Sequence, residues 1–178
     1  MAAAEVRYAV ADPSTPPPGL YAMLCAAFDE PPYENVPALM AKRLAAWPDF
    51  ARSNGFRVVT AHRGSELVGV CFGFVDVLGT ADEPALWAGL YERLRAAPFH
   101  DELRGAEIVE FATARAVRGR DVGQRLVDTL LDGRPGWLLA ESTAPAYGWY
   151  LRHGWRVLGP PHDATAYVVL ARDATVER

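Results

Sequence analysis

The apolar residues of this chain form two kinds of pattern that alternate along its length. Short runs rich in Val, Phe and Tyr are typical of strands, and apolar positions three and four apart are typical of amphipathic helices. Turn residues such as Asn54-Gly55 separate these runs. The pattern predicts strands at residues 5–10, 56–63, 67–78, 107–114, 136–142, 155–159 and 166–172. It predicts helices at about 18–28, 38–53, 83–97, 119–132 and 144–153, with a kink or break at Pro48.

The predicted elements follow one another through short links, and no domain boundary is visible between them. We therefore expect a single domain over residues 1–178, of the α+β class, with a sheet of about seven strands. The run at 67–75 is apolar at nearly every position, which predicts a strand covered on both faces. Helices are accordingly expected on both sides of the sheet.

The overall composition narrows the classes of function. Of the 178 residues, 51% are hydrophobic and 22% are charged, which is typical of a globular protein with a substantial core. The net charge of −4 provides no general basic face, so we expect no nucleic-acid partner. No apolar run is long enough to span a bilayer and no cationic leader is visible, so we expect a soluble, cytoplasmic protein without membrane contact.

Cysteines and histidines give no sign of a metal site. Cys25 and Cys71 stand alone in apolar runs and form no CxxC pair, and the four histidines lack metal-ligand spacing. We expect two core thiols and no bound metal.

The most informative stretch is VRGRDVGQRL at residues 117–126, which follows a strand and opens a helix. The first N–H groups of a helix have no internal partner and carry partial positive charge, so such a junction suits an anion. Glycines allow close approach, and Arg118 and Arg120 add charged donors. A nucleotide P-loop and a dinucleotide fingerprint both need residues that are missing here. The stretch predicts a phosphate site, the alternative being a solvated arginine face.

Two segments together resemble a known family. RGRDVG at 118–123 resembles the Arg/Gln-x-x-Gly-x-Gly/Ala motif of the GCN5-related N-acetyltransferases (GNAT family). APAYGWYLRHGW at 144–155 is similar to a later segment of that family, in which Ala146 precedes Tyr150 by four positions and Gly154-Trp155 follow. One departure is Asp121, which replaces the middle glycine of the first motif. A carboxylate suits the helix dipole but repels a nearby pyrophosphate, so it puts the tightness of coenzyme A binding in doubt.

The resemblance implies a mixed, mostly antiparallel, twisted sheet and transfer of an acetyl group from acetyl-coenzyme A to an amine. It places the pyrophosphate on the N–H groups of 119–123 and the pantetheine beside the strand at 110–114. The alternative is a non-catalytic acyl-coenzyme A binder or sensor with the same fold. The cofactor-binding residues that the resemblance implies are Phe111, Ala112, Thr113, Arg118, Gly119, Arg120, Asp121, Val122 and Gly123.

Transfer needs a base for the amine and an acid for the departing thiolate. Tyr150 stands where the family has its thiolate acid, although it could also be an interior aromatic residue. Glu110 and Glu107 are the candidate bases, with Glu110 narrowly preferred. The alternatives are a solvated glutamate and a water chain to Glu141 or to the acids near residue 30. Residues three apart on a strand point to opposite faces unless a bulge intervenes, so only one glutamate should face the thioester.

The acceptor site is expected near the first helices. Asp29, Glu30 and Tyr33 could attract a cationic amine, although loop acids are often merely solvated. Residues 79–103 form a helical insertion longer than the family's usual link, and its aromatic residues, including Trp87, are expected to cover the acceptor. The glutamate that faces them should then face the acceptor cavity. The expected partner is a small-molecule amine, and the sequence leaves open whether the chain forms a homodimer.

Overall fold

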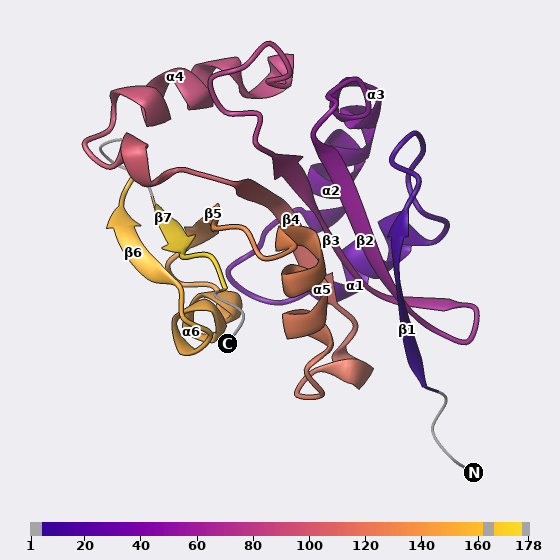
Figure 1. Cartoon of the computed structure of the whole chain (residues 1–178). Helices are drawn as coiled ribbons and strands as arrows, with labels where there is room; N and C mark the ends of the chain where they lie inside the picture. Colours follow the sequence, from indigo (N-terminus) through magenta and orange to yellow (C-terminus); the bar gives the residue numbers. More distant parts are fainter. Residues whose placement is uncertain (1–4, 162–165, 176–178) are drawn as a thin grey trace.

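The computed structural model describes residues 5–161 and 166–175, which form one seven-stranded sheet with helices on both faces (Figure 1). The strands lie in the order β1-β2-β3-β4-β5-β7-β6. Only β4 and β5 are parallel; every other neighbouring pair is antiparallel. The expected mixed, mostly antiparallel sheet is confirmed. The strands are β1 (Val6–Ala11), β2 (Phe56–Arg63), β3 (Glu66–Val75), β4 (Ala106–Thr113), β5 (Gly136–Glu141), β6 (Arg156–Gly159) and β7 (Tyr167–Arg172).

The helices lie close to the predicted positions. Pro48 does break the second predicted helix, since α2 ends at Ala45 and the short α3 begins at Trp47. No helix in residues 5–161 or 166–175 is long and apolar enough to cross a membrane. The α-helices are α1 (Leu20–Phe28), α2 (Val36–Ala45), α3 (Trp47–Phe50), α4 (Ala88–Ala96), α5 (Val122–Leu131) and α6 (Pro145–Arg152), and the 3₁₀ turns are η1 (Ala85–Trp87), η2 (His100–Glu102) and η3 (Arg115–Val117).

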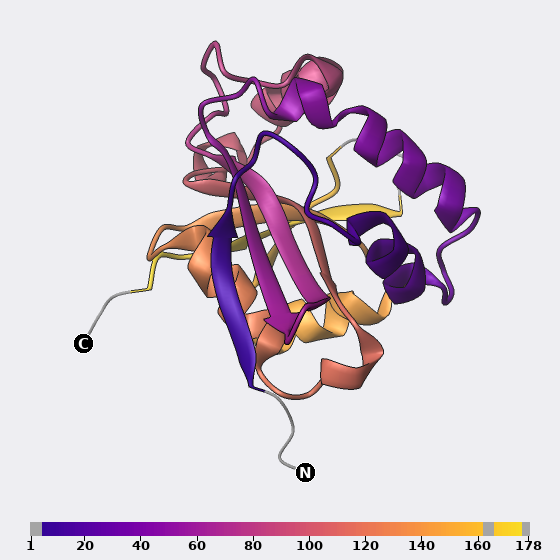
Figure 2. The ribbon, with the colours of Figure 1, turned by 90° about the vertical axis from the view of Figure 1, so that its right-hand side faces the viewer.

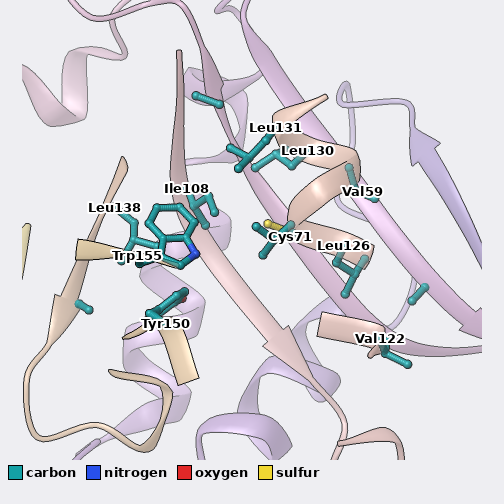
Figure 3. Close-up of a cluster of buried hydrophobic side chains, with 14 of the residues drawn as sticks. Val59, Cys71, Ile108, Val122, Leu126, Leu130, Leu131, Leu138, Tyr150 and Trp155 are labelled. Atoms are coloured by element: carbon teal, nitrogen blue, oxygen red, sulfur yellow. The ribbon is translucent and has the colours of Figure 1, made fainter. Parts of the chain in front are cut away.

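One face of the sheet is covered by α5 and α6 (Figure 3). The apolar side of α5 is buried as its periodicity predicts, and it packs on Val59 and Cys71 of the central strands. Tyr150 of α6 belongs to the same cluster and contacts Trp155, with the ring centroids 5.6 Å apart. The buried residues of α5 are Val122, Leu126, Val127, Leu130 and Leu131.

The opposite face is covered by α1, α2 and α3, which Figure 2 shows to one side of the strands. Aromatic rings of Trp47, Phe50, Phe56 and Phe72 pack edge to face or tilted in this layer. The inserted helix α4 extends the same layer, where Tyr91 packs against strands β5 and β7.

A bulge in β4 changes which way its glutamates point. Phe74 pairs with Glu107 and Phe72 with Glu110, so Val109 is an additional residue in β4. Residues directly opposite in an antiparallel pair share a face, and both glutamates therefore point to the face that α1–α4 cover. The expectation that only one of them faces this side is wrong, because the bulge corrects the alternation. A Cβ atom on Gly73 would overlap the Glu107 carbonyl oxygen, so this close approach requires glycine.

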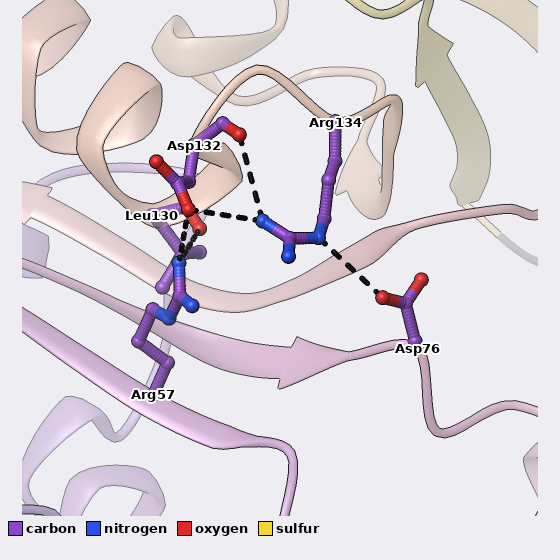
Figure 4. Close-up of polar contacts among 5 residues, drawn as sticks. All are labelled: Arg57, Asp76, Leu130, Asp132 and Arg134. Carbon is purple, nitrogen blue, oxygen red and sulfur yellow. Dashed lines mark hydrogen bonds and ion pairs between the residues drawn. The ribbon is translucent and has the colours of Figure 1, made fainter.

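The C-terminal end of α5 is fixed by charged residues (Figure 4). Arg57 of β2 donates a 3.1 Å hydrogen bond to the Leu130 carbonyl and lies 3.7 Å from Asp132. Arg134 pairs with Asp132 at 3.0 Å and with Asp76 at 3.4 Å. Cations near the last carbonyls complement the helix dipole. These contacts therefore fix the C-terminal end of α5 on the sheet, and with it the direction in which the N-terminal end of the helix points.

Candidate functional site

Strands β4 and β5 separate after a short parallel pairing. Their register covers Ala106–Ile108 and Gly136–Leu138 only. Beyond Ile108, the β4 residues 110–113 pair with β3 on one side, and no strand of the described chain lies on the other. Alternate backbone N–H and C=O groups of this segment therefore face an opening between the two strands, where an extended ligand could pair with them.

Two adjoining cavities occupy this opening. The larger has a volume of about 480 Å³ and lies between β4, the start of α5, α6 and the loop after α1. The smaller has a volume of about 130 Å³ and reaches from α2 across the separated strands to α6. They meet at four residues that line both: Phe28, Tyr33, Phe111 and Ala146.

The N-terminus of α5 forms one wall of the larger cavity. The helix begins at Val122, three residues later than predicted, because Gly119 (φ 74°) and Asp121 (φ 58°) adopt left-handed backbone conformations. Within the described chain, no N–H group of residues 119–124 donates to a backbone or side-chain acceptor. Unpaired N–H groups at a helix N-terminus form a cradle for an anion.

The left-handed conformation of Asp121 explains why aspartate can stand where the motif has glycine. Asp and Asn are the residues that adopt this region most readily after glycine. The side chain is exposed and makes no capping hydrogen bond. Asp121 therefore keeps the backbone of the loop intact but adds a negative charge to the rim of the larger cavity.

The two glycines of the loop have different roles. A Cβ atom on Gly123 would lie 2.8 Å from Cζ of Phe111 and 3.5 Å from the Trp149 ring. The absence of a side chain at Gly123 therefore lets α5 pack against β4. The sequence suggested instead that this glycine gives a phosphate access to the backbone. A Cβ atom on Gly119 would meet nothing within 4 Å, so Gly119 is the residue whose backbone is open.

The arginines of the loop do not act alike. Arg118 pairs with Glu30 at 2.8 Å and donates to the Ala27 carbonyl at 2.9 Å, so it joins the loop to the end of α1. Arg120 is exposed and lines neither cavity. Of the acids predicted for the acceptor site, Glu30 lines the larger cavity, whereas Asp29 lines neither. Neither Glu30 nor Asp29 therefore lines the smaller cavity, where Glu110 and Tyr150 lie.

Tyr150 lines the smaller cavity and is only 7% exposed. Its hydroxyl has no hydrogen-bond partner in residues 5–161 or 166–175. Burial raises the pKa of Tyr150 well above 10, and Cys71 and Glu110 add to the effect. A buried phenol that keeps its proton and lacks a protein acceptor can donate to a ligand.

Glu110 lines the same cavity, and its side chain is 11% exposed. Its carboxylate lies 3.3 Å from Nε of Arg43, a residue of α2 that the sequence did not single out. Burial raises the pKa of Glu110, and the Arg43 charge opposes that rise. Trp87 was expected to cover the acceptor site, but it lines neither cavity. The Arg43 guanidinium lies over its ring instead, 5.1 Å from the centroid.

Glu107 lies deeper, is 5% exposed and lines neither cavity. Tyr91 of the insertion donates a hydrogen bond to it. Burial raises the pKa of Glu107 to about 7, against the lowering effects of Tyr91 and Arg43. The expectation that the glutamate facing the insertion also faces the cavity is wrong: Glu107 faces Tyr91, and Glu110 faces the cavity. No residue of 79–103 lines either cavity. The insertion instead contacts Glu107 through Tyr91 and the Glu110 partner Arg43 through Trp87.

Several lining residues were not predicted. Arg152 and His153 line the larger cavity, and the His153 ring stacks on Trp149 with centroids 4.0 Å apart. Both fall inside the segment at 144–155, in which the resemblance gave a catalytic role to Tyr150 only. Glu141, which the sequence suggested only as the end of a water chain, stands at the end of β5 and lines the smaller cavity. In the described residues, no cluster of His, Cys, Asp or Glu is arranged to hold a metal ion.

Solved structures with the same arrangement cover nearly the whole chain. An acetyltransferase from Thermus thermophilus matches with a TM-score of 0.63 at 15% identity, over 97% of this chain and 99% of its own. The PaiA N-acetyltransferase of Thermoplasma acidophilum, solved with coenzyme A, matches with a TM-score of 0.63 at 9% identity, over 95% and 99%. A Desulfovibrio desulfuricans protein described as a GNAT-family acetyltransferase matches with a TM-score of 0.57 at 11% identity, over 95% and 99%.

The chain has the GNAT fold. No protein-family model matches the sequence, and no curated protein matches it. The likeness therefore resides in the fold, which bears out the resemblance drawn from the segments at 118–123 and 144–155. The separation of the GNAT strands β4 and β5 and the cradle at the start of α5 are the features on which a function can be argued.

Proposed function

We propose that the protein is an N-acetyltransferase that moves the acetyl group of acetyl-coenzyme A to an amine of a small molecule. The observation that carries this proposal is the adjacency of the two cavities. One joins an anion cradle to an open strand edge, and the other holds a buried tyrosine and a half-buried carboxylate. The two meet beside Phe111, where a thioester and an amine would have to meet.

Several features of the larger cavity suit parts of coenzyme A. The N–H groups of 119–124 suit its pyrophosphate, and the exposed guanidinium of Arg152 adds positive charge on the facing wall. The amides of the pantetheine arm are matched by the free edge of β4 at 110–113. When bound, acetyl-coenzyme A supplies the acetyl thioester; the remaining chemistry belongs to this chain's own residues.

Glu110 is the base that the geometry favours. An ammonium ion must lose a proton before its nitrogen can attack the acetyl carbon, and a partly buried carboxylate of raised pKa is a stronger base than an exposed one. The Arg43 ion pair keeps the carboxylate charged while the amine arrives. Glu107 has a raised pKa too, but the structure places it outside both cavities.

Tyr150 assists the leaving group. As the new C–N bond forms and the C–S bond breaks, the thiolate sulfur needs a hydrogen-bond donor and finally a proton. The raised pKa of Tyr150 lies above that of a free thiol, so its match to the thiol is poorer than the sequence suggested. We therefore assign it chiefly the role of a hydrogen-bond donor to the developing sulfur charge.

A non-catalytic acyl-coenzyme A binder is the second candidate, and Asp121 favours it. Its carboxylate lines the larger cavity, where it would repel a pyrophosphate. Thiol release from acetyl-coenzyme A in the presence of a panel of amines tests the two candidates. Amine-dependent release that Tyr150→Phe reduces supports transfer. Coenzyme A binding by calorimetry without amine-dependent release supports the second candidate.

A further inference from the structure

The smaller cavity carries more negative charge than the transfer reaction uses. Its charged lining residues in the described chain are Glu110, Glu141 and Arg43. Arg43 is committed to Glu110 at 3.3 Å and stacks on Trp87. Glu141 accepts a hydrogen bond from the Thr143 hydroxyl at 3.2 Å and has no ion-pair partner within residues 5–161 and 166–175. Among the described residues, the Glu141 carboxylate is thus left without a cationic partner.

The two glutamates stand on the two strands that separate. Glu110 is two residues beyond the last pair of β4 with β5, and Glu141 is three residues beyond that pair on β5. They therefore occupy opposite arms of the opening and both line the cavity between them. A ligand that bridges this space meets a carboxylate at each end.

The wall between the glutamates is aromatic and polar. Tyr33, Tyr147, Tyr150 and Tyr167 all line the smaller cavity. Burial raises the pKa of Tyr33 to about 12, and Glu110 and Glu141 both add to the rise, so its hydroxyl lies within the field of both carboxylates. Tyr150, which is 7% exposed, lines the same space, and its hydroxyl has no hydrogen-bond partner among the described residues. Aromatic faces and carboxylates together favour an organic cation.

We propose that the acceptor is a short aliphatic diamine, held with one nitrogen beside Glu110 and the other beside Glu141. This inference rests on the proposed function. The nitrogen beside Glu110 gives up its proton to that carboxylate and takes the acetyl group, while the other stays an ammonium paired with Glu141. The volume of about 130 Å³ restricts the acceptor to a short chain.

The charges also disfavour the neighbouring substrate classes. An amino acid of the same length would place its carboxylate against Glu141, and the Arg43 guanidinium that could attract it is already paired. A monoamine would leave Glu141 uncompensated beside an apolar methyl group. A buried or half-buried charge gains most from a partner of opposite sign.

Three acceptors of one length test this inference: 1,4-diaminobutane, butylamine and 4-aminobutanoate, which end in an ammonium, a methyl and a carboxylate group. With the wild-type protein, kcat/KM for the diamine should exceed that for butylamine by about 10-fold or more, as expected for a charged hydrogen bond. The value for 4-aminobutanoate should be the lowest. This comparison needs no variant.

Glu141→Gln locates the effect. It should raise KM for 1,4-diaminobutane about 10-fold and leave kcat for that acceptor within about twofold. It should also leave kcat/KM for butylamine within about twofold and raise kcat/KM for 4-aminobutanoate. Glu92→Gln, at an exposed position of α4, is the matched control and should change nothing. Butylamine used as well as the diamine, or equal losses for all three acceptors in Glu141→Gln, would overturn the inference alone. No thiol release with any amine would overturn the proposed function with it.

Discussion

Tyr91 donates a hydrogen bond to Glu107 and so joins the inserted helix α4 to the central strand β4. Both side chains are buried, and the tyrosine belongs to a cluster with Trp137 and Val169. The contact places a carboxyl group of raised pKa inside the fold, three residues before Glu110 on β4 and outside the cavity that Glu110 lines. Its first consequence concerns stability rather than catalysis.

Stability should fall as the pH rises through the titration of Glu107. Its pKa is raised to about 7 from an ordinary value of 4.5, so between these values the folded state retains a proton that the unfolded state releases. The unfolding free energy therefore decreases from about pH 4.5 to pH 7, by roughly 3 kcal/mol at most. Denaturant unfolding at several pH values measures this. Glu107→Gln should have the flatter profile, and identical slopes in the two proteins would contradict the assignment.

Tyr150→Phe should lower kcat by roughly 10- to 1000-fold, the usual effect of losing an acid or donor to the leaving group. Coenzyme A affinity should change little, because the hydroxyl lies in the smaller cavity. Since it has no protein partner in the described chain, its removal leaves no acceptor unpaired and should cost little stability. Steady-state kinetics and calorimetry on the same preparations check both halves. Equal turnover would mean that Tyr150 only packs.

The base can be identified from pH–rate profiles. Glu110→Gln should lose the acidic limb of kcat/KM, because the group that must be deprotonated is gone. Glu107→Gln should keep that limb, since Glu107 lines neither cavity. The opposite pattern would reverse the assignment. If both variants keep the limb, a water chain to Glu141 becomes the better explanation.

Gly123→Val should weaken coenzyme A binding by about 2 kcal/mol. A side chain here displaces Phe111 and Trp149, which both line the larger cavity. Calorimetry measures the affinity, and thermal unfolding shows whether the variant folds. Gly133→Ala is a suitable control: it also removes a loop glycine, at φ 78°, but its Cβ would meet nothing within 4 Å and it lines neither cavity. Unchanged affinity in folded Gly123→Val would contradict the role given to this loop.

The sequence predicted the elements well because their periodicity is strong. The strand at 67–75 and the apolar face of α5 are long, regular patterns, and the break at Pro48 follows from the missing N–H of proline. Tyr150 was singled out because its segment resembles a GNAT motif. These features are local, and local sequence encodes them.

The features that the sequence could not predict depend on distant parts of the chain. The bulge at Val109 lies where β4 pairs with Phe72 and Gly73 of β3, and it decides that Glu107 and Glu110 share a face. The ion pair of Arg43 with Glu110 joins α2 to β4, and no spacing within either element indicates it. The insertion was expected over the acceptor for its aromatic residues, yet Trp87 packs on Arg43 instead. The aromatic residues of a segment indicate that their side chains will be buried, but they do not indicate which residues they will pack against.

Arg118 connects a wall of the larger cavity to a segment that reaches both cavities. Its guanidinium serves Glu30 and the Ala27 carbonyl, and so holds the loop that leads to Tyr33, a residue common to both cavities. A phosphate that took one of these donors would release that loop. Thermodynamic coupling between two ligands is reciprocal: if the first substrate changes the affinity for the second by some factor, the second changes the affinity for the first by the same factor. The two substrates should therefore show intersecting initial-velocity patterns with unequal free and ternary dissociation constants, and Arg118→Met should bring those constants together.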